Sequence, residues 1–343
     1  MDAEPFSEGG RPLARTLAAL APVAPEAAAR ATAALGLCLE GVRRSIWPEV
    51  AWRFSRLQPG GFPVELGFST AGESITYTAE VAGPEAAEAT RLDAALRLLD
   101  ALGAGVPPAA TVARLRGLQA AGRLRWGAWL GGRHGGDDDR FKLYAEAPEG
   151  GDPTDFIRRS LGGLSLAGIA VQGPFLHMAG SEPGGRSELY FRFDGFAPGG
   201  LRRLLALAGL GEREGELRAV LDAAWEAPAE AALARAVGWF SLSLPPDGGP
   251  PDRLSLFKRA VSVLGPGRGG RRRLLALAGG SGGGSGGGAL AAYRRITRDL
   301  ETCDGRGAHG SLSFVVSPGR PVELRIGIDP SAIIHEDPRG ELI

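Results

Sequence analysis

The sequence predicts an α+β protein whose centre is a closed barrel of ten antiparallel β-strands, surrounded by a ring of helices. Three observations lead to this prediction. The chain contains five pairs of extended segments, each pair flanks a turn rich in Gly, Pro or Asp, and helical segments separate the pairs. The five predicted hairpins span residues 63–81, 123–147, 168–195, 237–260 and 309–329. We expect them to form one domain covering residues 1–343.

The turns and the intervening segments have the expected local chemistry. The turn sequences are TAGES, RHGGDDD, AGSEPGG, PPDGGPPD and SPGR, near residues 72, 136, 182, 248 and 318. Between the hairpins, apolar residues recur every three or four positions, as in one-sided helices. This spacing predicts helices over Pro84–Leu102, Asp152–Leu161, Gly200–Leu207, Glu214–Trp225 and Ala289–Leu300.

Two segments are expected to be flexible. Residues 1–10 precede the first patterned segment, and Gly279–Gly288 reads GGSGGGSGGG, a low-complexity linker composition. The sequence leaves open whether this linker is natural or engineered.

The predicted strands alternate between apolar and polar residues, so one face of each strand is apolar and the other carries charges. In RFKLYAE, for example, Phe141 and Leu143 oppose Lys142 and Tyr144. Two architectures fit this pattern. The polar face could look into solvent on an open sheet, or it could line the lumen of a closed barrel whose apolar face packs on helices. Ten strongly twisted strands tend to close, because closure removes unpaired edges.

The bulk composition excludes some function classes. The 39 basic and 39 acidic residues give no net charge, which argues against a nucleic-acid-binding protein. No apolar run is long enough to span a bilayer, and the acidic N-terminus does not resemble a signal peptide. Cys38 and Cys303 lie far apart without a CxxC motif, so neither a disulfide nor a zinc site is expected, and a reduced cytoplasmic location is the default.

The five hairpin units, with a Lys-x-Tyr strand in the second, resemble the ABBA-type aromatic prenyltransferases. These include the dimethylallyltryptophan-synthase-like enzymes and the cyanobactin peptide prenyltransferases. The resemblance covers about residues 45–330. PVELGFSTAGESITYTAEV is similar to the first hairpin of the family and RFKLYAEAP to the second. GRSELYFRF is similar to a third-hairpin strand of the peptide-modifying branch, although the Arg-x-Lys-x-Tyr order of the family is not kept.

The resemblance implies transfer of a dimethylallyl or longer prenyl group from its diphosphate to an aromatic acceptor. Cationic side chains would stabilise the leaving diphosphate, aromatic rings would shield the allyl cation, and a carboxylate would orient the acceptor. Glu65 takes the place of the acceptor-orienting acid, with an ordinary surface carboxylate as the alternative. The implied diphosphate-binding residues, by similarity and by their place on the polar face, are Arg140, Lys142, Arg192, Arg253 and Arg325.

The aromatic shield implied by the resemblance is small, since the chain has four tyrosines. It comprises Tyr144, Tyr190, Phe257, Trp129 and Trp239. Thr76 stands where the fungal branch has an arginine.

No metal site is expected among the protein side chains. The four histidines, at positions 134, 177, 309 and 335, are scattered, and Asp137–Asp139 is interpreted as a solvated turn. Mg²⁺ is expected only if the chain belongs to the peptide-modifying branch.

The acceptor stays open between an indole such as free tryptophan, another aromatic small molecule, and an aromatic side chain in a peptide. Two other functions remain as alternatives. The first is a non-catalytic barrel that binds an anionic lipid or metabolite, and the second is an open α+β scaffold for a protein partner.

Overall fold

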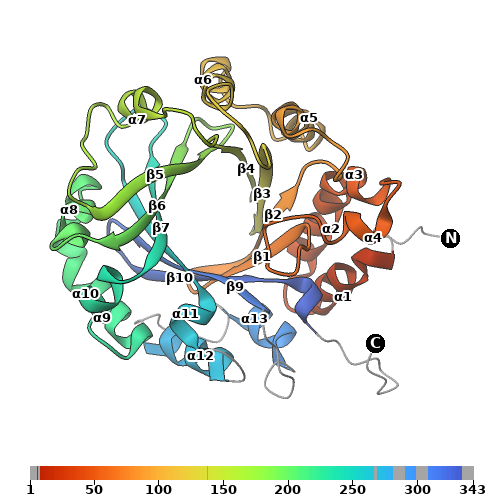
Figure 1. The fold of residues 1–343 in the computed structure, drawn as a ribbon. Helices are drawn as coiled ribbons and strands as arrows, with labels where there is room; N and C mark the ends of the chain where they lie inside the picture. Colours follow the sequence, from red (N-terminus) through yellow and green to blue (C-terminus); the bar gives the residue numbers. More distant parts are fainter. Residues whose placement is uncertain are drawn as a thin grey trace.

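The computed structural model describes Phe6 and residues 8–136, 138–265, 269–280, 290–298 and 308–333. Ten antiparallel strands close into a barrel in the order β1-β10-β9-β8-β7-β6-β5-β4-β3-β2 (Figure 1). The strands are β1 Val64–Ser69, β2 Gly72–Glu80, β3 Ala128–Gly135, β4 Asp138–Glu146, β5 Ala170–Ser181, β6 Ser187–Phe196, β7 Val237–Leu244, β8 Arg253–Arg259, β9 His309–Ser317 and β10 Arg320–Ile328.

The first and last strands close the barrel. Leu66 of β1 pairs with Ile328 of β10, and Phe68 pairs with Ile326. The open-sheet alternative is therefore wrong, and the predicted closed barrel is confirmed. All five predicted hairpins are present, and each forms two neighbouring strands.

Helices surround the barrel, as Figure 1 shows. The longer helices are α1 Arg11–Leu20, α2 Pro25–Cys38, α5 Arg91–Ala101, α6 Ala109–Gln119, α7 Thr154–Ser160, α8 Gly200–Leu207, α9 Glu214–Trp225 and α12 Gly269–Gly280. The shorter ones are α3 Glu40–Arg43, α4 Pro48–Ala51, α10 Ala229–Ala234, α11 Ala260–Leu264 and α13 Ala291–Ile296. Among the described residues, no helix combines the length and apolar character needed to cross a membrane.

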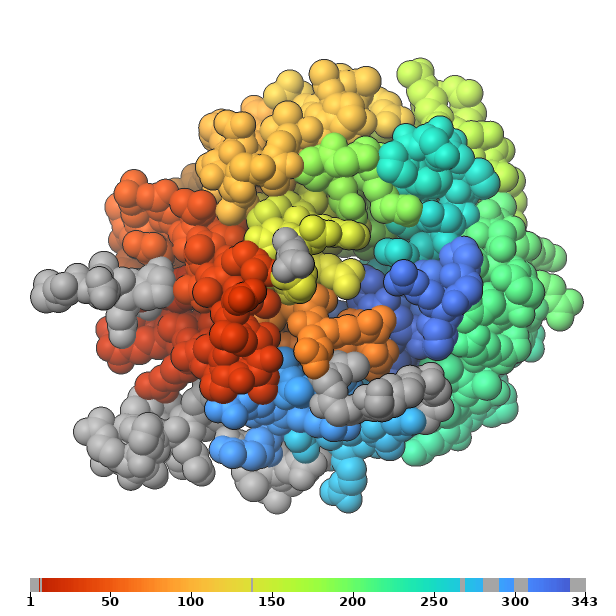
Figure 2. All heavy atoms as spheres, turned by 180° about the vertical axis from the view of Figure 1, so that it is seen from behind, coloured from red at the N-terminus to blue at the C-terminus, as the bar shows by residue number. Residues whose placement is uncertain are grey.

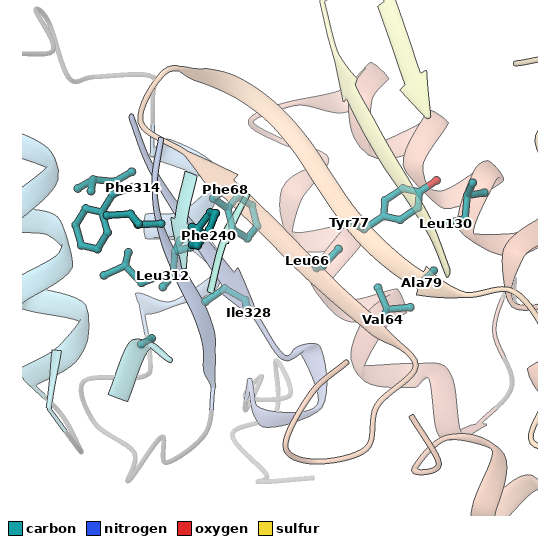
Figure 3. Packing of buried hydrophobic residues seen from close by; sticks show 14 of the residues in the cluster. Val64, Leu66, Phe68, Tyr77, Ala79, Leu130, Phe240, Leu312, Phe314 and Ile328 are labelled. Atoms are coloured by element: carbon teal, nitrogen blue, oxygen red, sulfur yellow. The ribbon is translucent and has the colours of Figure 1, made fainter. Parts of the chain in front are cut away.

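The hydrophobic core lies between the outer face of the barrel and this ring of helices. The apolar residues of each strand point outward, as the alternation predicts. Figure 3 shows part of this layer, including Leu66, Tyr77 and Phe314. Phe314 of β9 packs against Trp225 of α9, with ring centroids 6.1 Å apart. The polar residues of the same strands consequently face the lumen.

One helix and one turn are among the segments that differ from the predicted boundaries. The helix predicted over Pro84–Leu102 begins at Arg91, because the chain before it wraps around the buried Arg91 guanidinium, which donates to the Gly83 carbonyl and to Glu80. The second hairpin turn is tighter than predicted, because β3 continues to Gly135 and Gly136 takes the left-handed φ of 56°.

The segments expected to be flexible are described in part. Phe6 is buried, and Glu8–Gly10 forms a short 3-10 helix. Of Gly279–Gly288, the first two residues belong to α12, and 281–288 lie outside the described residues, as do Cys303, Asp137 and His335.

Figure 2 looks onto the end of the barrel where the hairpin turns lie, and these turns gather around the axis. We call this the turn end. The opposite end, where the connections through the helices enter the strands, is called the helix end.

Candidate active site

The lumen is shaped by an arrangement of small residues beside large ones. Gly131 opposes Lys142, and Gly180 lies between Tyr144 and Glu188 in the strand register. Ser241 opposes Tyr190 in the same way. Because the neighbouring strands contribute little volume, each large side chain can lean across the adjacent strand into the lumen.

Lys142 lies at the centre of a hydrogen-bonded network in the lumen. Its Nζ is 2.5 Å from Oε2 of Glu188 and 3.6 Å from Oε1 of Glu182. Ser241 Oγ donates to the other oxygen of Glu188. Burial disfavours the charged form of Lys142, but the charge and hydrogen bond of Glu188, together with the charges of Tyr144 and Glu182, outweigh burial and raise the lysine pKa.

The same network shifts the pKa of Glu188 in the opposite direction. Burial alone would raise it, but the charge and the hydrogen bond of Lys142 lower the pKa to about 2. Lys142 and Glu188 are therefore both ionised around neutral pH.

Four arginines lie near one another toward the turn end. Arg325 is held by Glu323, with Nε 2.6 Å from Oε1. Burial lowers the pKa of Arg133, and the positive charges of Arg325, Arg140 and Arg253 lower it further. No carboxylate among the described residues forms an ion pair with Arg133 or Arg253. This arginine group is an electropositive region in which an anionic group would be stabilised.

Arg133 was missed from the sequence because RHGGDDD was assigned to the turn. The strand β3 continues through it, and Arg133 opposes both Arg140 and Thr76. An arginine side chain is thus present beside Thr76 in the strand register. The side chain of Arg140 itself is 66% exposed at the rim, 3.8 Å from Asp138.

Three rings form a row along the lumen wall. The Tyr144 and Tyr190 centroids are 5.8 Å apart, and the Tyr190 and Phe257 centroids are also 5.8 Å apart. Lys142 Nζ lies 5.9 Å from the Tyr144 ring. Trp239 opposes Phe257 in the strand register and extends the aromatic surface toward the helix end.

Trp129 opposes Tyr144 in the register but is buried. Its indole N–H donates to Glu80 over 3.1 Å, and Glu80 also binds Ser55 and the buried Arg91. This network fixes the orientation of the Trp129 ring at the helix end of the lumen.

Arg192 is separated from the other predicted cationic residues. It opposes Trp239 and Phe175 near the helix end, and it is exposed. Its charge acts on His177 and not on the Lys142 network. The structure therefore brings Lys142, Arg253 and Arg325 together with Arg140 at the rim, and places Arg192 elsewhere.

Glu65 lies in a separate polar pocket toward the helix end. Ser311 Oγ donates to its Oε1 over 2.8 Å. A β-carbon on Gly327 would lie 1.8 Å from that same Oε1, so only glycine leaves room for the carboxylate. Burial raises the pKa of Glu65, a hydrogen bond from Ser311 and contact with Gln58 lower it, and nearby Asp329 raises it further.

Gln58 belongs to the same pocket and was not identified from the sequence. It is 3% exposed on the loop before β1, and neither its Nε2 nor its Oε1 has a well-aligned hydrogen bond. A β-carbon on Gly310 would lie 2.7 Å from Gln58 Oε1 and 2.9 Å from Glu65 Oε1. The amide and the carboxylate thus converge beside this glycine.

No set of three metal-ligating side chains is found within the described part of the chain. Asp139 of the predicted aspartate-rich turn belongs to the strand β4 and contacts Arg30 and His134 on the outer side. Glu182 and Glu188 both form ion pairs with Lys142 Nζ.

Solved structures show which type of barrel this is. The chain superposes on 6-dimethylallyltryptophan synthase from Micromonospora olivasterospora, solved with DMASPP and Trp, at a TM-score of 0.74. That match has 19% identity and covers 95% of this chain and 98% of the other. The chain has the prenyltransferase-barrel fold. The matching 5-dimethylallyl tryptophan synthase from Streptomyces coelicolor has a TM-score of 0.74 and 17% identity, covering 98% and 97% of the two chains.

The prenyltransferase barrel also matches AnaPT from Neosartorya fischeri, at a TM-score of 0.62 and 11% identity over 92% of each chain. No protein-family model and no curated protein matches the sequence. The prenyltransferase-barrel fold is therefore recognised by comparing structures, because the sequence identities to these proteins are too low for sequence comparison to detect.

Proposed function

We propose that this protein transfers a prenyl group from a prenyl diphosphate to an aromatic acceptor. The observation that supports this most is the order of groups along the lumen. Arg133, Arg253 and Arg325 lie toward the turn end, the row of Tyr144, Tyr190 and Phe257 follows, and Glu65 lies toward the helix end. This order matches the three chemical requirements of prenyl transfer.

The proposed mechanism uses each group in turn. Lys142 and the arginine group stabilise the negative charge that develops on the diphosphate as the carbon–oxygen bond breaks. The rings of Tyr144, Tyr190 and Phe257 face the allyl cation and exclude water. Glu65 accepts a hydrogen bond from the acceptor and receives the proton lost when the aromatic carbon forms its new bond.

Dimethylallyl diphosphate and an indole are the first donor and acceptor to test. Two matching structures were solved with DMASPP and Trp, which supports this choice. A peptide acceptor and a requirement for Mg²⁺ remain to be tested, and the cytoplasmic location is proposed on the sequence alone. Without a third ligand near Glu182 and Glu188 in the described part of the chain, we assign no protein-bound metal to the mechanism.

The test is a turnover assay with the full chain. Dimethylallyl diphosphate is incubated with L-tryptophan, indole or a tryptophan-containing peptide, with and without Mg²⁺, and diphosphate and prenylated product are quantified. Lys142→Met should reduce turnover by about 100-fold, because removing one stabilising donor costs roughly 3 kcal/mol.

The matched control is Lys258→Met. Lys258 is also a buried lysine on a barrel strand, but its Nζ donates to the Val237 carbonyl and lies over the Phe193 ring, away from the lumen network. It should keep its turnover. Absence of product with every acceptor, together with calorimetric binding of diphosphate, would instead favour the non-catalytic barrel that binds an anionic lipid or metabolite.

A further inference from the structure

The Lys142–Glu188 pair places a negative charge inside the proposed diphosphate site. Glu188 is 7% exposed, and both of its carboxylate oxygens accept hydrogen bonds, one from Lys142 and the other from Ser241. Tyr190 contributes a further hydrogen bond. The carboxylate is held in place by residues of three strands, β4, β6 and β7, so it cannot turn away from Lys142 without breaking these contacts.

The charge of Glu188 reaches beyond Lys142. It acts on Tyr144, Tyr190 and Arg325, which contribute the cationic and aromatic parts of the site. Since the pKa of Glu188 is about 2, it stays negative at any pH at which the protein would work. A diphosphate that approaches Lys142 therefore meets a fixed negative charge 2.5 Å from the lysine nitrogen.

Glu188 and a bound diphosphate would compete for the same Lys142 ammonium group and repel each other. Like charges a few ångströms apart repel strongly at the effective dielectric of a protein interior. Arg133 and Arg253, by contrast, form no ion pair with a described carboxylate, and Glu323 and Asp252 act on them only from a longer distance. A diphosphate thus gains less from Lys142 than the lysine alone would offer.

We propose that Glu188 is an internal competitor of the diphosphate for Lys142, and that it determines how tightly the donor and the released diphosphate are held. This rests on the proposed function, because it assigns Lys142 to the diphosphate. In the free protein Glu188 keeps Lys142 in position. When diphosphate is bound, the negative charge of Glu188 weakens the binding of diphosphate to Lys142. This favours release of diphosphate after the reaction. Glu188 is a positioning residue and does not react.

The test uses inorganic diphosphate as the probe, with binding to the full chain measured by calorimetry. Glu188→Gln keeps the shape and, through its amide oxygen, one of the two accepted hydrogen bonds, but removes the charge. It should therefore tighten diphosphate binding about tenfold, a conservative fraction of the expected repulsion. Glu182→Gln removes the same charge at the longer distance of 3.6 Å and should tighten binding only about two- to threefold.

A double-mutant cycle tests whether the effect passes through Lys142. In the Lys142→Met background, Glu188→Gln should change diphosphate affinity much less than in the wild type, because the shared cation is gone. If Glu188 were only a structural residue, Glu188→Gln would weaken diphosphate binding, lower the thermal midpoint and show no dependence on Lys142. Unchanged or weaker binding in Glu188→Gln overturns the proposal.

A second variant keeps the test decisive if Glu188→Gln does not fold. Glu188→Asp retains the charge but withdraws it by one methylene group, so diphosphate should bind more tightly than to the wild type but less tightly than to a neutral variant. This result does not depend on turnover. If neutralising Glu188 tightens diphosphate binding but no prenylated product forms, competition for Lys142 is supported and the proposed transfer reaction is refuted. If the wild type turns over but neutralising Glu188 leaves diphosphate binding unchanged, the transfer reaction is supported and the competition is refuted.

Discussion

Tyr144 lies directly over Gly131, and a β-carbon at position 131 would be 2.8 Å from Cε2 of the tyrosine ring. The two residues belong to neighbouring strands, and the absence of a side chain on β3 is what allows the ring to lean across it. The phenol of Tyr144 then meets Tyr190 and stands close to Lys142. One glycine thereby determines the position of the first ring in the aromatic row.

Gly131→Ala should displace Tyr144 and reduce prenyl-transfer turnover by at least tenfold. Overpacking a well-filled site costs about 1–3 kcal/mol, which corresponds to tenfold or more if the displaced ring is needed in the transition state. The assay is kcat for dimethylallyl transfer together with the free energy of unfolding.

Gly36→Ala is the control for this change. Gly36 lies within α2, and a β-carbon on it would meet no heavy atom within 4 Å beyond the backbone of its own helix. This variant should keep its turnover and gain about 0.5–1 kcal/mol of stability, as alanine does in a helix interior. Normal turnover in Gly131→Ala would show that the ring position is not needed.

Glu65 should produce an acidic limb in the pH–rate profile. Burial raises its pKa, and the proposed role needs the carboxylate, so kcat/KM should rise with pH through a midpoint above the ordinary 4.5. Glu65→Gln should lower kcat/KM by about 100-fold and abolish this limb. The same limb in Glu65→Gln would assign it to another group.

The raised pKa of Glu65 also affects stability, with the opposite sign from a salt-bridged carboxylate. The folded protein binds the proton more tightly than the unfolded chain, so this group stabilises the fold at low pH and the contribution is lost as pH rises through the folded-state pKa. The difference in unfolding free energy between Glu65→Gln and the wild type should therefore favour the variant more at pH 7 than at pH 4.

Two buried glutamines should respond oppositely to replacement by leucine. Gln58 has no well-aligned hydrogen bond, whereas Gln119 donates to the Gly127 carbonyl over 2.5 Å. Gln119→Leu should lose about 1–2 kcal/mol of unfolding free energy, because it leaves a buried carbonyl without its donor. Gln58→Leu should be neutral or stabilising, because removing two buried amide atoms without well-aligned hydrogen bonds offsets the lost contact with the Glu65 carboxylate.

Gln58→Leu should also change the titration of Glu65. Contact with Gln58 lowers the Glu65 pKa, so its removal should move the acidic limb to higher pH. A loss of stability like that of Gln119→Leu, with an unchanged limb, would mean that Gln58 serves the fold and not the pocket. Chemical denaturation and the pH–rate profile measure these two quantities.

Deprotonation of Lys258 should make the unfolding free energy rise with pH in mildly alkaline solution. It is 4% exposed, and burial lowers its pKa to about 8. Between this value and the ordinary 10.5, the unfolded chain binds more protons than the folded one, so stability rises with pH over this window. Lys258→Met should remove that slope and stabilise the protein at pH 7 by about 1–2 kcal/mol, after allowing for the lost hydrogen bond to Val237.

A flat stability profile for the wild type between pH 8 and pH 10 would show that Lys258 is not desolvated as the structure indicates. Urea denaturation at several pH values distinguishes the two cases. The variant is also informative as an active-site control, since Lys258 lies outside the lumen network.

Sequence patterns were sufficient to predict the ten strands and to assign their inward and outward faces. Hydrophobic alternation is a local property, so it placed Lys142 and Tyr144 on one face and Phe141 and Leu143 on the other before any fold was known. The one-sided helices left the outer face as the only apolar surface on which they could pack. Both properties also fit an open sheet, so closure was favoured by the number of twisted strands and decided by the pairing of β1 with β10.

The contacts between lumen side chains, in contrast, depend on how the strands are arranged in three dimensions. Lys142 and Glu188 lie on β4 and β6 with the strand β5 between them, and their contact depends on the tilt of the strands and on the missing side chain at Gly180. Gln58 reaches Glu65 from a loop with no periodic pattern, and Arg192 shares the polar face of Tyr190 yet lies toward the other end. Alternation specifies a face but not a depth along the barrel, so the pairing of charges in the lumen could not be predicted from the sequence.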